Sequence, residues 1–323
     1  MVVFSRNKKP MIKDLKTIIE VIQFFNDEKI CRAYLEQRRW NGTVTSLVSS
    51  SIQISKYKDE RTYRCRDCKK LFKVTTGTIF ENSKIPLRSW FAAMYLFTSH
   101  KTSVSALQIS RHMAISQRSG WFMHHRIMEA VSNHLHLRQP QPGRWQVDEV
   151  YIGPLKNRLS YARKKKIRAG TGGIHSVPIL GFYREGHDLF GMVLPVAADQ
   201  SIIHPLLKKF ICPMSTLLTD GSHLYQNLKG YFLSHEVFIH SDGEYARDGN
   251  HTNTIEGSFR HFKDSIRGTY KQLTVKHMQR YWDEFCFRYN TRNLSDIERF
   301  ELLFETINRR ITYKQLIDPN GRL

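Results

Sequence analysis

The segment from His251 to Tyr270, HTNTIEGSFRHFKDSIRGTY, restricts the possible folds of this chain more than any other segment does, because it contains two patterns at helical spacing. An apolar stripe recurs at i, i+4, i+7 and i+11, at Ile255, Phe259, Phe262 and Ile266. A charged stripe follows one residue later, at Glu256, Arg260, Lys263 and Arg267. The spacing predicts a helix over residues 254–267 that buries its aromatic side and lines the rim with one acid and three bases. Such a rim suits a metal ion that holds a phosphodiester, although the solvated edge of an ordinary amphipathic helix has the same pattern.

The charge balance indicates a polyanionic partner. Lysine and arginine number 50 against 29 aspartate and glutamate residues, which gives a formal net charge of +21. Nucleic acid fits this excess better than a membrane surface, because the bases are spread over several segments and do not form one amphipathic helix. A basic protein that is merely soluble is the alternative.

Cysteine usage and hydropathy indicate the compartment. The first residues, MVVFSRNKKPMIKD, do not resemble a secretory signal, and no window approaches eighteen uncharged apolar residues. The 5 cysteines are scattered except for one CxxC pair, which argues against a disulfide scaffold. We therefore expect a cytoplasmic protein without a membrane span, associated with the nucleoid in a bacterium.

The N-terminal part reads as helical over residues 11–40, with a break at Asn41 and Gly42, followed by short strands up to residue 73. Within those strands, Cys65-Arg-Asp-Cys68 is similar to one knuckle of a zinc ribbon, in which two CxxC turns supply four thiolates.

The first knuckle of such a ribbon is degenerate. Ser46 and Ser49 have the same spacing, about where the first CxxC would stand, and serine is a poor zinc ligand. We expect a degraded or empty site in which Cys65 and Cys68 pack without metal. An irregular zinc site completed by Cys31 or a histidine is the alternative.

The next region predicts a helical hairpin. Residues 88–98 suit a helix, and SVSALQISRHMAISQRSGWFMHHRIMEAV reads as helix, turn, helix with Ser103 and Ser116 as N-caps. This pattern fits a helix-turn-helix, although such hairpins are common in proteins that never touch DNA. The candidate DNA contacts on the second helix are Gln117, Arg118, His124, His125 and Arg126.

A second domain begins after the linker HLRQPQPGRW. WQVDEVYIG alternates as a strand, with Asp148 on the face of Gln146 and Val150. The basic segment over residues 154–173 then carries 7 bases and no acid, and we expect it to contact phosphates, a solvated flap being the alternative. Its candidate DNA-binding residues include Lys164, Lys165, Lys166 and Arg168.

The remaining elements predict an α/β fold with a mixed sheet. HSVPILGFY and LFGMVLPV form a hairpin, SIIHPLLKKFI a helix, and STLLTDG a buried strand that ends at Asp220. HLYQNLKGYF reads as a helix and HEVFIH as a last strand before the charged helix. Two helix patterns follow Gly268, and the first is dense in aromatic residues, which indicate core packing, base stacking being the alternative.

Three acids stand out in this second domain. Asp148 lies inside an apolar strand, Asp220 at the end of another, and Glu256 at the start of the helix. Burying a carboxylate in an apolar strand is unfavourable by several kcal/mol unless a cation compensates. Hard oxygen ligands select Mg²⁺ or Mn²⁺, and two such ions about 4 Å apart serve in-line phosphoryl transfer. Asp148 would bridge both ions, and Asp220 and Glu256 would each add a ligand.

Taken together, these motifs resemble the DDE transposases of bacterial insertion sequences, and most closely the ISXO-type group, which carries an N-terminal zinc ribbon. WQVDEVYIG, LLTDG and HTNTIEGSFRHFKDSIRGTY carry the resemblance, with 35 residues between Asp220 and Glu256, and TGTIFENSKIPLRSW and HMQRYWDEFCFRYNTR also match that group. The resemblance implies a ribonuclease-H-like catalytic domain, a site for two Mg²⁺ ions, and a homo-oligomer on DNA. The implied activity is cleavage and strand transfer at the terminal inverted repeats, with target DNA as the second substrate.

The same resemblance assigns the acids to Asp148, Asp220 and Glu256, and the accompanying bases to Arg260 and Lys263. Some members of the group use asparagine as the third ligand, so Asn253, one turn earlier, is the alternative to Glu256. Other readings of the function are an inactive DNA-binding remnant and a ribonuclease-H-like nuclease without strand transfer. The expected regions are residues 1–80 (helix and degenerate ribbon), 81–137 (helix-turn-helix-like), 138–143 (linker), 144–292 (catalytic) and 293–323 (helical extension).

Overall fold

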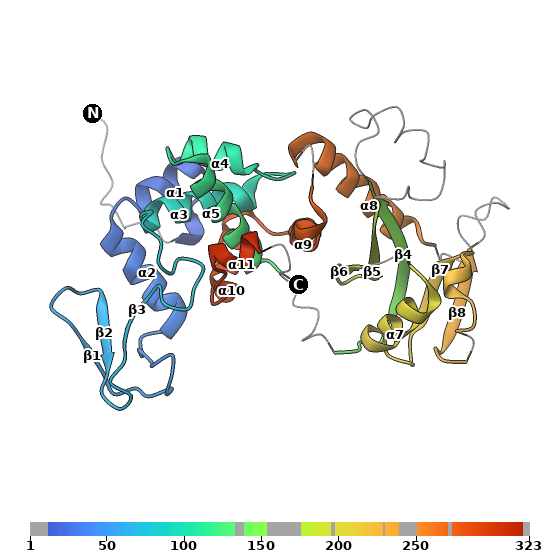
Figure 1. The fold of residues 1–323 in the computed structure, drawn as a ribbon, viewed down its shortest axis with the longest axis horizontal. Coiled ribbons are helices and arrows are strands. Elements are labelled where there is room, and N and C mark those ends of the chain that lie inside the picture. Colours follow the sequence, from blue (N-terminus) through green and yellow to red (C-terminus); the bar gives the residue numbers. More distant parts are fainter. Residues whose placement is uncertain are drawn as a thin grey trace, which may run out of the picture. The chain divides into compact units, whose positions relative to one another are not determined.

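The computed structural model describes residues 12–132, 139–153, 176–194, 198–228, 230–238, 251–270 and 273–318 (Figure 1). The chain divides into two compact units. Unit 1 comprises Met1–Val131 together with Thr291–Arg322, and unit 2 comprises Ser132–Asn290. The last helices of the chain therefore pack with the N-terminal region.

Unit 1 is mainly helical. Its helices are η1 (Ile12–Asp14), α1 (Ile18–Phe24), α2 (Glu28–Trp40), α3 (Leu87–Ser99), α4 (Ala106–His112), α5 (Gln117–Ala130), α10 (Asp296–Thr306) and α11 (Tyr313–Ile317). Phe91 on α3 is fully buried and makes edge-to-face contacts with Phe25 and with Phe304 of α10, at ring-centroid distances of 4.9 and 5.0 Å. These aromatic contacts join the C-terminal segment to the N-terminal helices.

The predicted N-terminal helix is two helices in the structure. Asp27 interrupts the pattern because its side chain accepts a hydrogen bond from the Lys29 amide and caps α2. The predicted end is confirmed: Asn41 is left-handed at φ 45°, and Gly42 follows at φ 92°.

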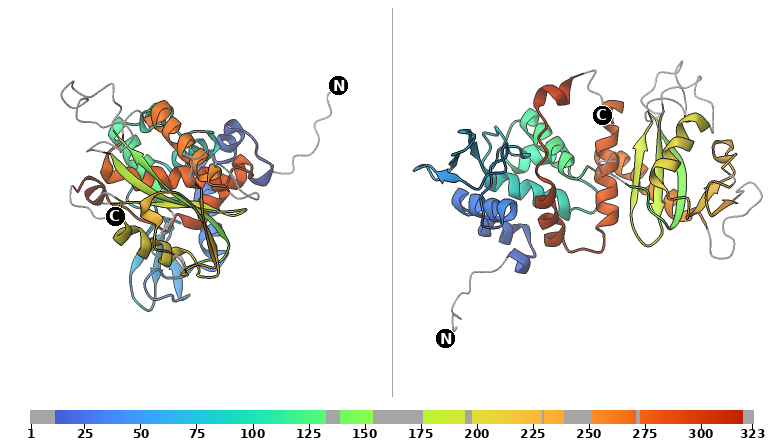
Figure 2. Two further views of the ribbon diagram at one scale, coloured as in Figure 1. Left: turned by 90° about the vertical axis from the view of Figure 1, so that its right-hand side faces the viewer. Right: turned by 90° about the horizontal axis from the view of Figure 1, so that it is seen from below.

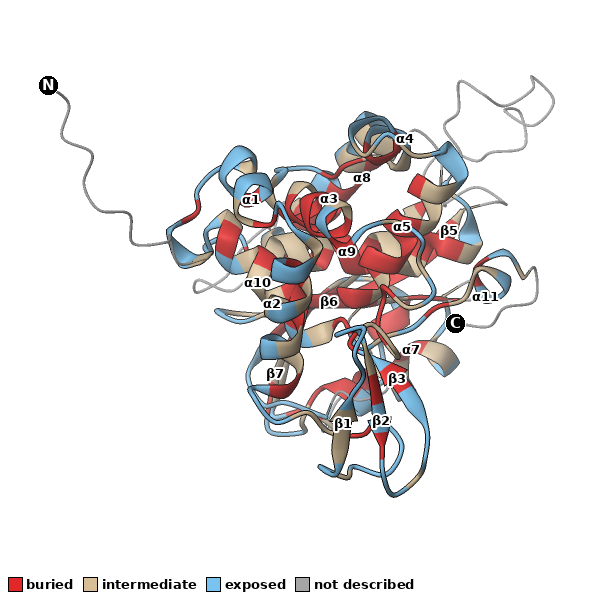
Figure 3. Ribbon diagram, turned by 90° about the vertical axis from the view of Figure 1, so that its left-hand side faces the viewer, coloured by how far each residue is buried: buried red, intermediate tan, exposed pale blue. Residues whose placement is uncertain are grey.

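Strands β1 (Ile54–Lys56), β2 (Thr62–Cys65) and β3 (Leu71–Lys73) form a small antiparallel sheet, here called the ribbon. Most of its residues are exposed or half-buried, whereas α3 is buried over most of its length (Figure 3). This small buried apolar surface is not enough to stabilise a three-stranded sheet by itself. We therefore expect the turns of the ribbon to contribute to its stability.

Helices α4 and α5 form the predicted hairpin, with one cap misassigned. Ser116 caps α5 as predicted, but α4 is capped by Ser105, whose hydroxyl forms a capping box with Gln108. The assignment of Ser103 as a cap was therefore wrong. Gly120 lets the helices touch, because a Cβ there would lie 2.7 Å from Ser110 Cβ.

Unit 2 is built on a mixed five-stranded sheet, as predicted. Its strands are β4 (Arg144–Ile152), β5 (Val177–Arg184), β6 (Leu189–Val193), β7 (Thr216–Asp220) and β8 (Ser234–Phe238). The spatial order is β6-β5-β4-β7-β8; β4, β5 and β6 are antiparallel, and β7 and β8 run parallel to β4. The predicted hairpin turn lies between β5 and β6, where Gly186 has φ 72°.

Helices cover both faces of this sheet. The helices of unit 2 are α7 (Gln200–Phe210), η4 (His223–Tyr225), α8 (Asn253–Ser265), η6 (Ile266–Tyr270), η7 (Val275–His277) and α9 (Met278–Asn290). Figure 2 shows α7 against one face and α8 with α9 against the other, in agreement with the two apolar clusters of this unit. Among the described residues, no helix has the length and apolar character needed to cross a membrane.

The segment HLYQNLKGYF is not the helix that its composition predicts. Only His223–Tyr225 forms a 3-10 turn, which Ser222 caps through the Leu224 amide. Asn227 then takes a left-handed conformation at φ 63°, and Gly230 has φ 81°. Two left-handed residues within one turn stop an α-helix from propagating.

Candidate active site

Asp148 lies in the middle of β4, the central strand of the sheet. Alternation along β4 places Trp145 and Val147 in the apolar cluster on the α7 side and Val150 in the cluster on the α8 side. Asp148 therefore shares a face with Val150, as the alternation predicts, and this is the face that α8 covers; its neighbour on β5 is Gly181.

Asp220 ends the adjacent strand β7 at the same level. The parallel pairs run from Arg144 with Thr216 to Gln146 with Leu218, at a constant offset. The last of these pairs lies two residues before Asp148 and Asp220, so the same offset assigns the two acids to one face of the sheet. The Ser222 amide donates to Asp220 Oδ1 at 3.1 Å and closes the turn that follows the strand.

Glu256 lies in the first turn of α8, which shows the predicted amphipathic pattern. Ile255, Phe259, Phe262 and Ile266 are buried. Arg260, Lys263 and Arg267 are exposed. Glu256 is half-buried, and Thr252 Oγ1 donates to its Oε1 at 2.7 Å. Asn253, the alternative third ligand, is exposed at the first position of the helix.

Electrostatics link the three acids. The pKa of Asp148 is raised well above its usual range, first by burial, then by the negative charges of Glu149 and Asp220, and also by Glu256. Asp220 and Glu256 are therefore each close enough to Asp148 for their charges to disfavour its ionised form.

Glu149 lies on the opposite face of β4 and was not among the predicted site residues. Burial raises its pKa, while the buried Tyr225 hydroxyl donates to Glu149 Oε2 at 2.6 Å and favours the ionised form. Its position one residue after Asp148 explains why it adds negative charge to the site without sharing its face.

The donor set fits a divalent cation chemically, because three carboxylates supply the hard oxygen atoms that Mg²⁺ and Mn²⁺ prefer. In the part of the chain that the structure describes, however, no three His, Cys, Asp or Glu side chains converge into a group that could hold an ion. The acids are thus neighbours on one face rather than a preformed set of ligands.

Two glycines allow the helices to lie close to the sheet beside Asp148. Gly181 pairs with Gly191 on β6, so the two glycines and Asp148 form one row across three strands. A Cβ at Gly181 would lie 2.7 Å from Phe259, and one at Gly191 would lie 2.5 Å from Trp282 of α9. Because neither glycine has a side chain, Phe259 of α8 and Trp282 of α9 can lie directly against the sheet. Gly181 therefore allows α8, which carries Glu256, to approach the strands closely.

The ribbon has four side chains at the predicted ligand positions, but two of them are hydroxyls. Ser46 Oγ lies 3.7 Å from Cys68 Sγ, and Ser49 Oγ lies 3.4 Å from Cys65 Sγ. The Ser49 hydrogen bond is the largest of the effects that lower the pKa of Cys65 to about 6. Cys31 takes no part, since its thiol donates to Phe25 O at 3.6 Å within the helical core. Zinc does not fit this set, because two of the four groups are neutral hydroxyls.

The predicted DNA contacts on α5 differ in their surroundings. Arg118 is exposed, and its guanidinium lies 4.5 Å from the centre of the Tyr313 ring. Arg126 is only 4% exposed and donates to the carbonyls of Ile79, Glu81 and Ile311. The expectation that Arg126 contacts DNA is therefore corrected: a buried guanidinium bonded to three carbonyls holds unit 1 together.

The other predicted DNA contacts are two histidines on α5 and the bases of the basic segment. His124 and His125 are also buried, at 1% and 0% exposure, so neither is available for a surface contact. The basic residues Lys164, Lys165, Lys166 and Arg168 lie outside the described residues.

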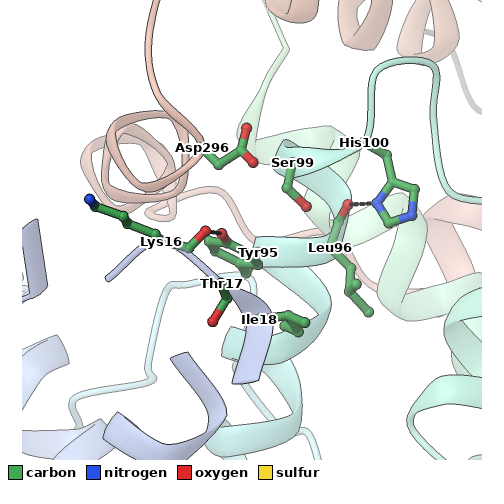
Figure 4. Close-up of a pocket in the computed structure, with 8 residues that line it drawn as sticks. All are labelled: Lys16, Thr17, Ile18, Tyr95, Leu96, Ser99, His100 and Asp296. Atoms are coloured by element: carbon green, nitrogen blue, oxygen red, sulfur yellow. Dashed lines mark hydrogen bonds between the residues drawn. The ribbon is translucent and has the colours of Figure 1, made fainter. Parts of the chain in front are cut away.

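A surface pocket of about 340 Å³ in unit 1 is chemically unlike the acid site. It is lined by Lys16, Thr17, Ile18, Tyr95, Leu96, Ser99, His100 and Asp296 (Figure 4). Tyr95 donates to the Lys16 carbonyl at 3.0 Å, and His100 Nδ1 lies 2.7 Å from the Leu96 carbonyl. These polar groups are already bonded to backbone, and the lining brings together no pair of carboxylates.

The mixed sheet, with acids on two adjacent strands and on a covering helix, is compatible with a transposase catalytic domain. Residues 142–290, which make up most of unit 2, match the family model of the ISXO2-like transposase domain. The chain is also 29% identical over 248 residues to the "Uncharacterized protein in transposable element ISH50" of Halobacterium salinarum, covering 73% of this chain and 82% of that protein. No solved structure matches the chain significantly. The resemblance to insertion-sequence DDE transposases is thereby confirmed.

Proposed function

We propose that this transposase binds the ends of its own insertion sequence and catalyses metal-dependent cleavage and transfer of DNA strands. The observation that supports the proposal is that Asp148 and Asp220 lie on adjacent strands and Glu256 on the helix covering the same face, while burial and then the charges of nearby acids raise the pKa of Asp148. Like charges held near one another are destabilising unless they are compensated, and a bound cation would compensate them.

In this proposal Asp148, Asp220 and Glu256 hold two Mg²⁺ or Mn²⁺ ions. When bound, the ions lower the pKa of an attacking water or hydroxyl and stabilise charge on the leaving oxygen. The protein supplies the carboxylates and their orientation: Ser222 fixes Asp220 and Thr252 fixes Glu256 through the hydrogen bonds described above. The five-stranded mixed sheet, with acids on adjacent central strands, supports a ribonuclease-H-like assignment for unit 2.

Exposed bases near the acids would position the DNA. Arg260 and Lys263 lie one and two turns after Glu256 on the exposed edge of α8, where they would hold phosphate oxygens. Arg118 on α5 is the candidate for contact with the end sequence, and Lys164, Lys165, Lys166 and Arg168 are candidates for phosphate contacts. Oligomerisation on the paired ends is part of the proposal.

The test is strand cleavage by the purified protein on DNA that carries the sequences flanking its gene. Asp220→Asn should lower cleavage in Mg²⁺ by at least about a thousandfold, because it removes a ligand charge where ions assist the reaction. Binding to the same DNA should stay within about threefold of wild type. Asp264→Asn is the matched control, since Asp264 is an exposed acid on α8 that pairs with Arg267.

Three outcomes separate the candidate functions. Cleavage followed by joining to a target plasmid supports the transposase, and cleavage without joining supports a nuclease. DNA binding without cleavage supports an inactive remnant. Undiminished cleavage by Asp220→Asn would reject the site assignment.

A further inference from the structure

Gln146 is a fully buried polar side chain beside the acid site, at 0% exposure. It lies on β4 two residues before Asp148, and alternation along the strand puts both side chains on the α8 face. Its amide bonds to α8 and to two other segments. Oε1 accepts from the Ile255 amide at 3.1 Å, and Nε2 lies 3.3 Å from Glu185 Oε1 and 3.4 Å from His251 Nδ1.

The hydrogen bond to Ile255 replaces a missing helix cap. The first amides of a helix have no partner within the helix, and an N-cap side chain usually accepts from one of them. Thr252, the N-cap residue of α8, makes no such bond, because its hydroxyl donates to Glu256 instead. The amide of Ile255, adjacent to Glu256, is satisfied from the sheet by Gln146.

We infer that Gln146 is a positioning residue for the third acid, an inference that rests on the proposed function. One side chain ties the strand that carries Asp148 to the peptide next to Glu256. It thereby sets the rotation and height of the first turn of α8 over the sheet. A shift of this turn would change how Glu256 and Asp148 share an ion, so the free energy of metal binding depends on this tie.

The amide of Gln146 makes three hydrogen bonds at this position. Its oxygen accepts from the Ile255 amide, the bond on which the positioning role depends, and its nitrogen donates to Glu185 and to His251. Gln146→Leu keeps the approximate volume and loses all three bonds. Gln146→Glu keeps the acceptor but sets a carboxylate against Glu185.

The experiment is a Mg²⁺ titration of DNA cleavage by the full chain. Gln146→Leu should raise the Mg²⁺ concentration for half-maximal cleavage about 10- to 100-fold, the range typical of residues that orient metal ligands. Thermal unfolding of the same preparations reports stability separately.

Gln279→Leu is the matched control. Gln279 also joins a helix to the sheet, since its Oε1 accepts from the Val193 amide at 2.8 Å and its Nε2 donates to the Gly191 carbonyl at 2.9 Å. It contacts the edge strand β6 and no acid of the site. Gln279→Leu should lower the unfolding temperature and leave the Mg²⁺ requirement within about twofold of wild type.

A rescue variant distinguishes positioning from folding. Gln146→Glu combined with Glu185→Gln exchanges the two groups, so the acceptor for Ile255 remains and the 146–185 hydrogen bond reverses its direction. This double variant should return the Mg²⁺ requirement to within about threefold of wild type, and Gln146→Glu alone should not.

The outcomes keep this inference separate from the proposed function. If the wild-type chain cleaves no DNA, the proposed function fails. If it cleaves, and Gln146→Leu needs no more Mg²⁺ than Gln279→Leu, Gln146 has no positioning role and the function stands. If Gln146→Leu does not fold, the double variant decides: restored folding with an unrestored Mg²⁺ requirement overturns the inference.

Discussion

At the scale of single residues, the acid site opposes stability. The pKa of Asp148 is raised by burial and by the neighbouring acids, which means that its ionised form is disfavoured in the folded chain. A raised carboxyl pKa gives stability that is present at low pH and is lost as the pH rises from the unfolded pKa to the folded one. At neutral pH without metal, Asp148 therefore destabilises the fold.

Asp148→Asn should consequently stabilise the metal-free protein while it abolishes cleavage. The free energy of unfolding at pH 7 should increase by roughly 0.5–2 kcal/mol, a range common for single stabilising substitutions. The difference from wild type should shrink towards pH 4, where the wild-type carboxyl is protonated in the folded state. Urea unfolding at both pH values, with chelator present, measures it. A variant less stable than wild type at pH 7 would contradict the pKa argument.

At the scale of elements, the predictions from sequence succeeded where a pattern repeats and failed where side chains compete for the backbone. The stripes of α8 and the alternation of β4 could be predicted, because a helix or strand with one buried face places apolar residues at periods of 3.6 or 2 residues. The cap of α4 was misassigned, since Ser103 and Ser105 are both serines near a helix start and only the fold selects one.

Contacts between segments far apart in the sequence determine the roles of two residues that local patterns could not assign. Arg126 has the charge of a DNA contact, yet carbonyls from two other segments enclose it. Gln146 lies on the same face of β4 as Asp148, as the alternation indicates. Its role, however, depends on how α8 packs against β4, and no local sequence pattern predicts that packing.

The ribbon gives a prediction at this scale. Because Ser46 and Ser49 lie within hydrogen-bonding distance of the two thiols, the ribbon should fold without zinc. The purified chain should contain well under one zinc per molecule, and EDTA should leave its unfolding temperature unchanged.

Ser46→Cys with Ser49→Cys supplies the matched comparison. Four cysteines at the same positions should bind one zinc, and EDTA should then lower the unfolding temperature. Zinc measured by mass spectrometry in both proteins decides the question. Stoichiometric zinc in the wild-type chain would show that the serines are not an obstacle.

At the scale of the whole molecule, the net charge of +21 predicts DNA binding that depends steeply on salt. Each phosphate contact releases condensed counterions, so the logarithm of the binding constant falls with the logarithm of salt concentration by about 0.9 per contact. The basic segment that contains Lys164 and Lys165 has 7 bases and no acid, so it should supply a large share of these contacts.

Replacing Lys164 and Lys165 by glutamine should therefore reduce the salt slope by about 1.8, and it should weaken binding to all DNA sequences alike. Lys208→Gln with Lys209→Gln removes the same charge from the last turn of α7, on the opposite face of the sheet from the acids. If net charge alone attracts DNA, both pairs of substitutions will lower the slope equally. A larger effect at Lys164 and Lys165, measured by fluorescence anisotropy between 50 and 200 mM salt, assigns the contacts to the basic segment.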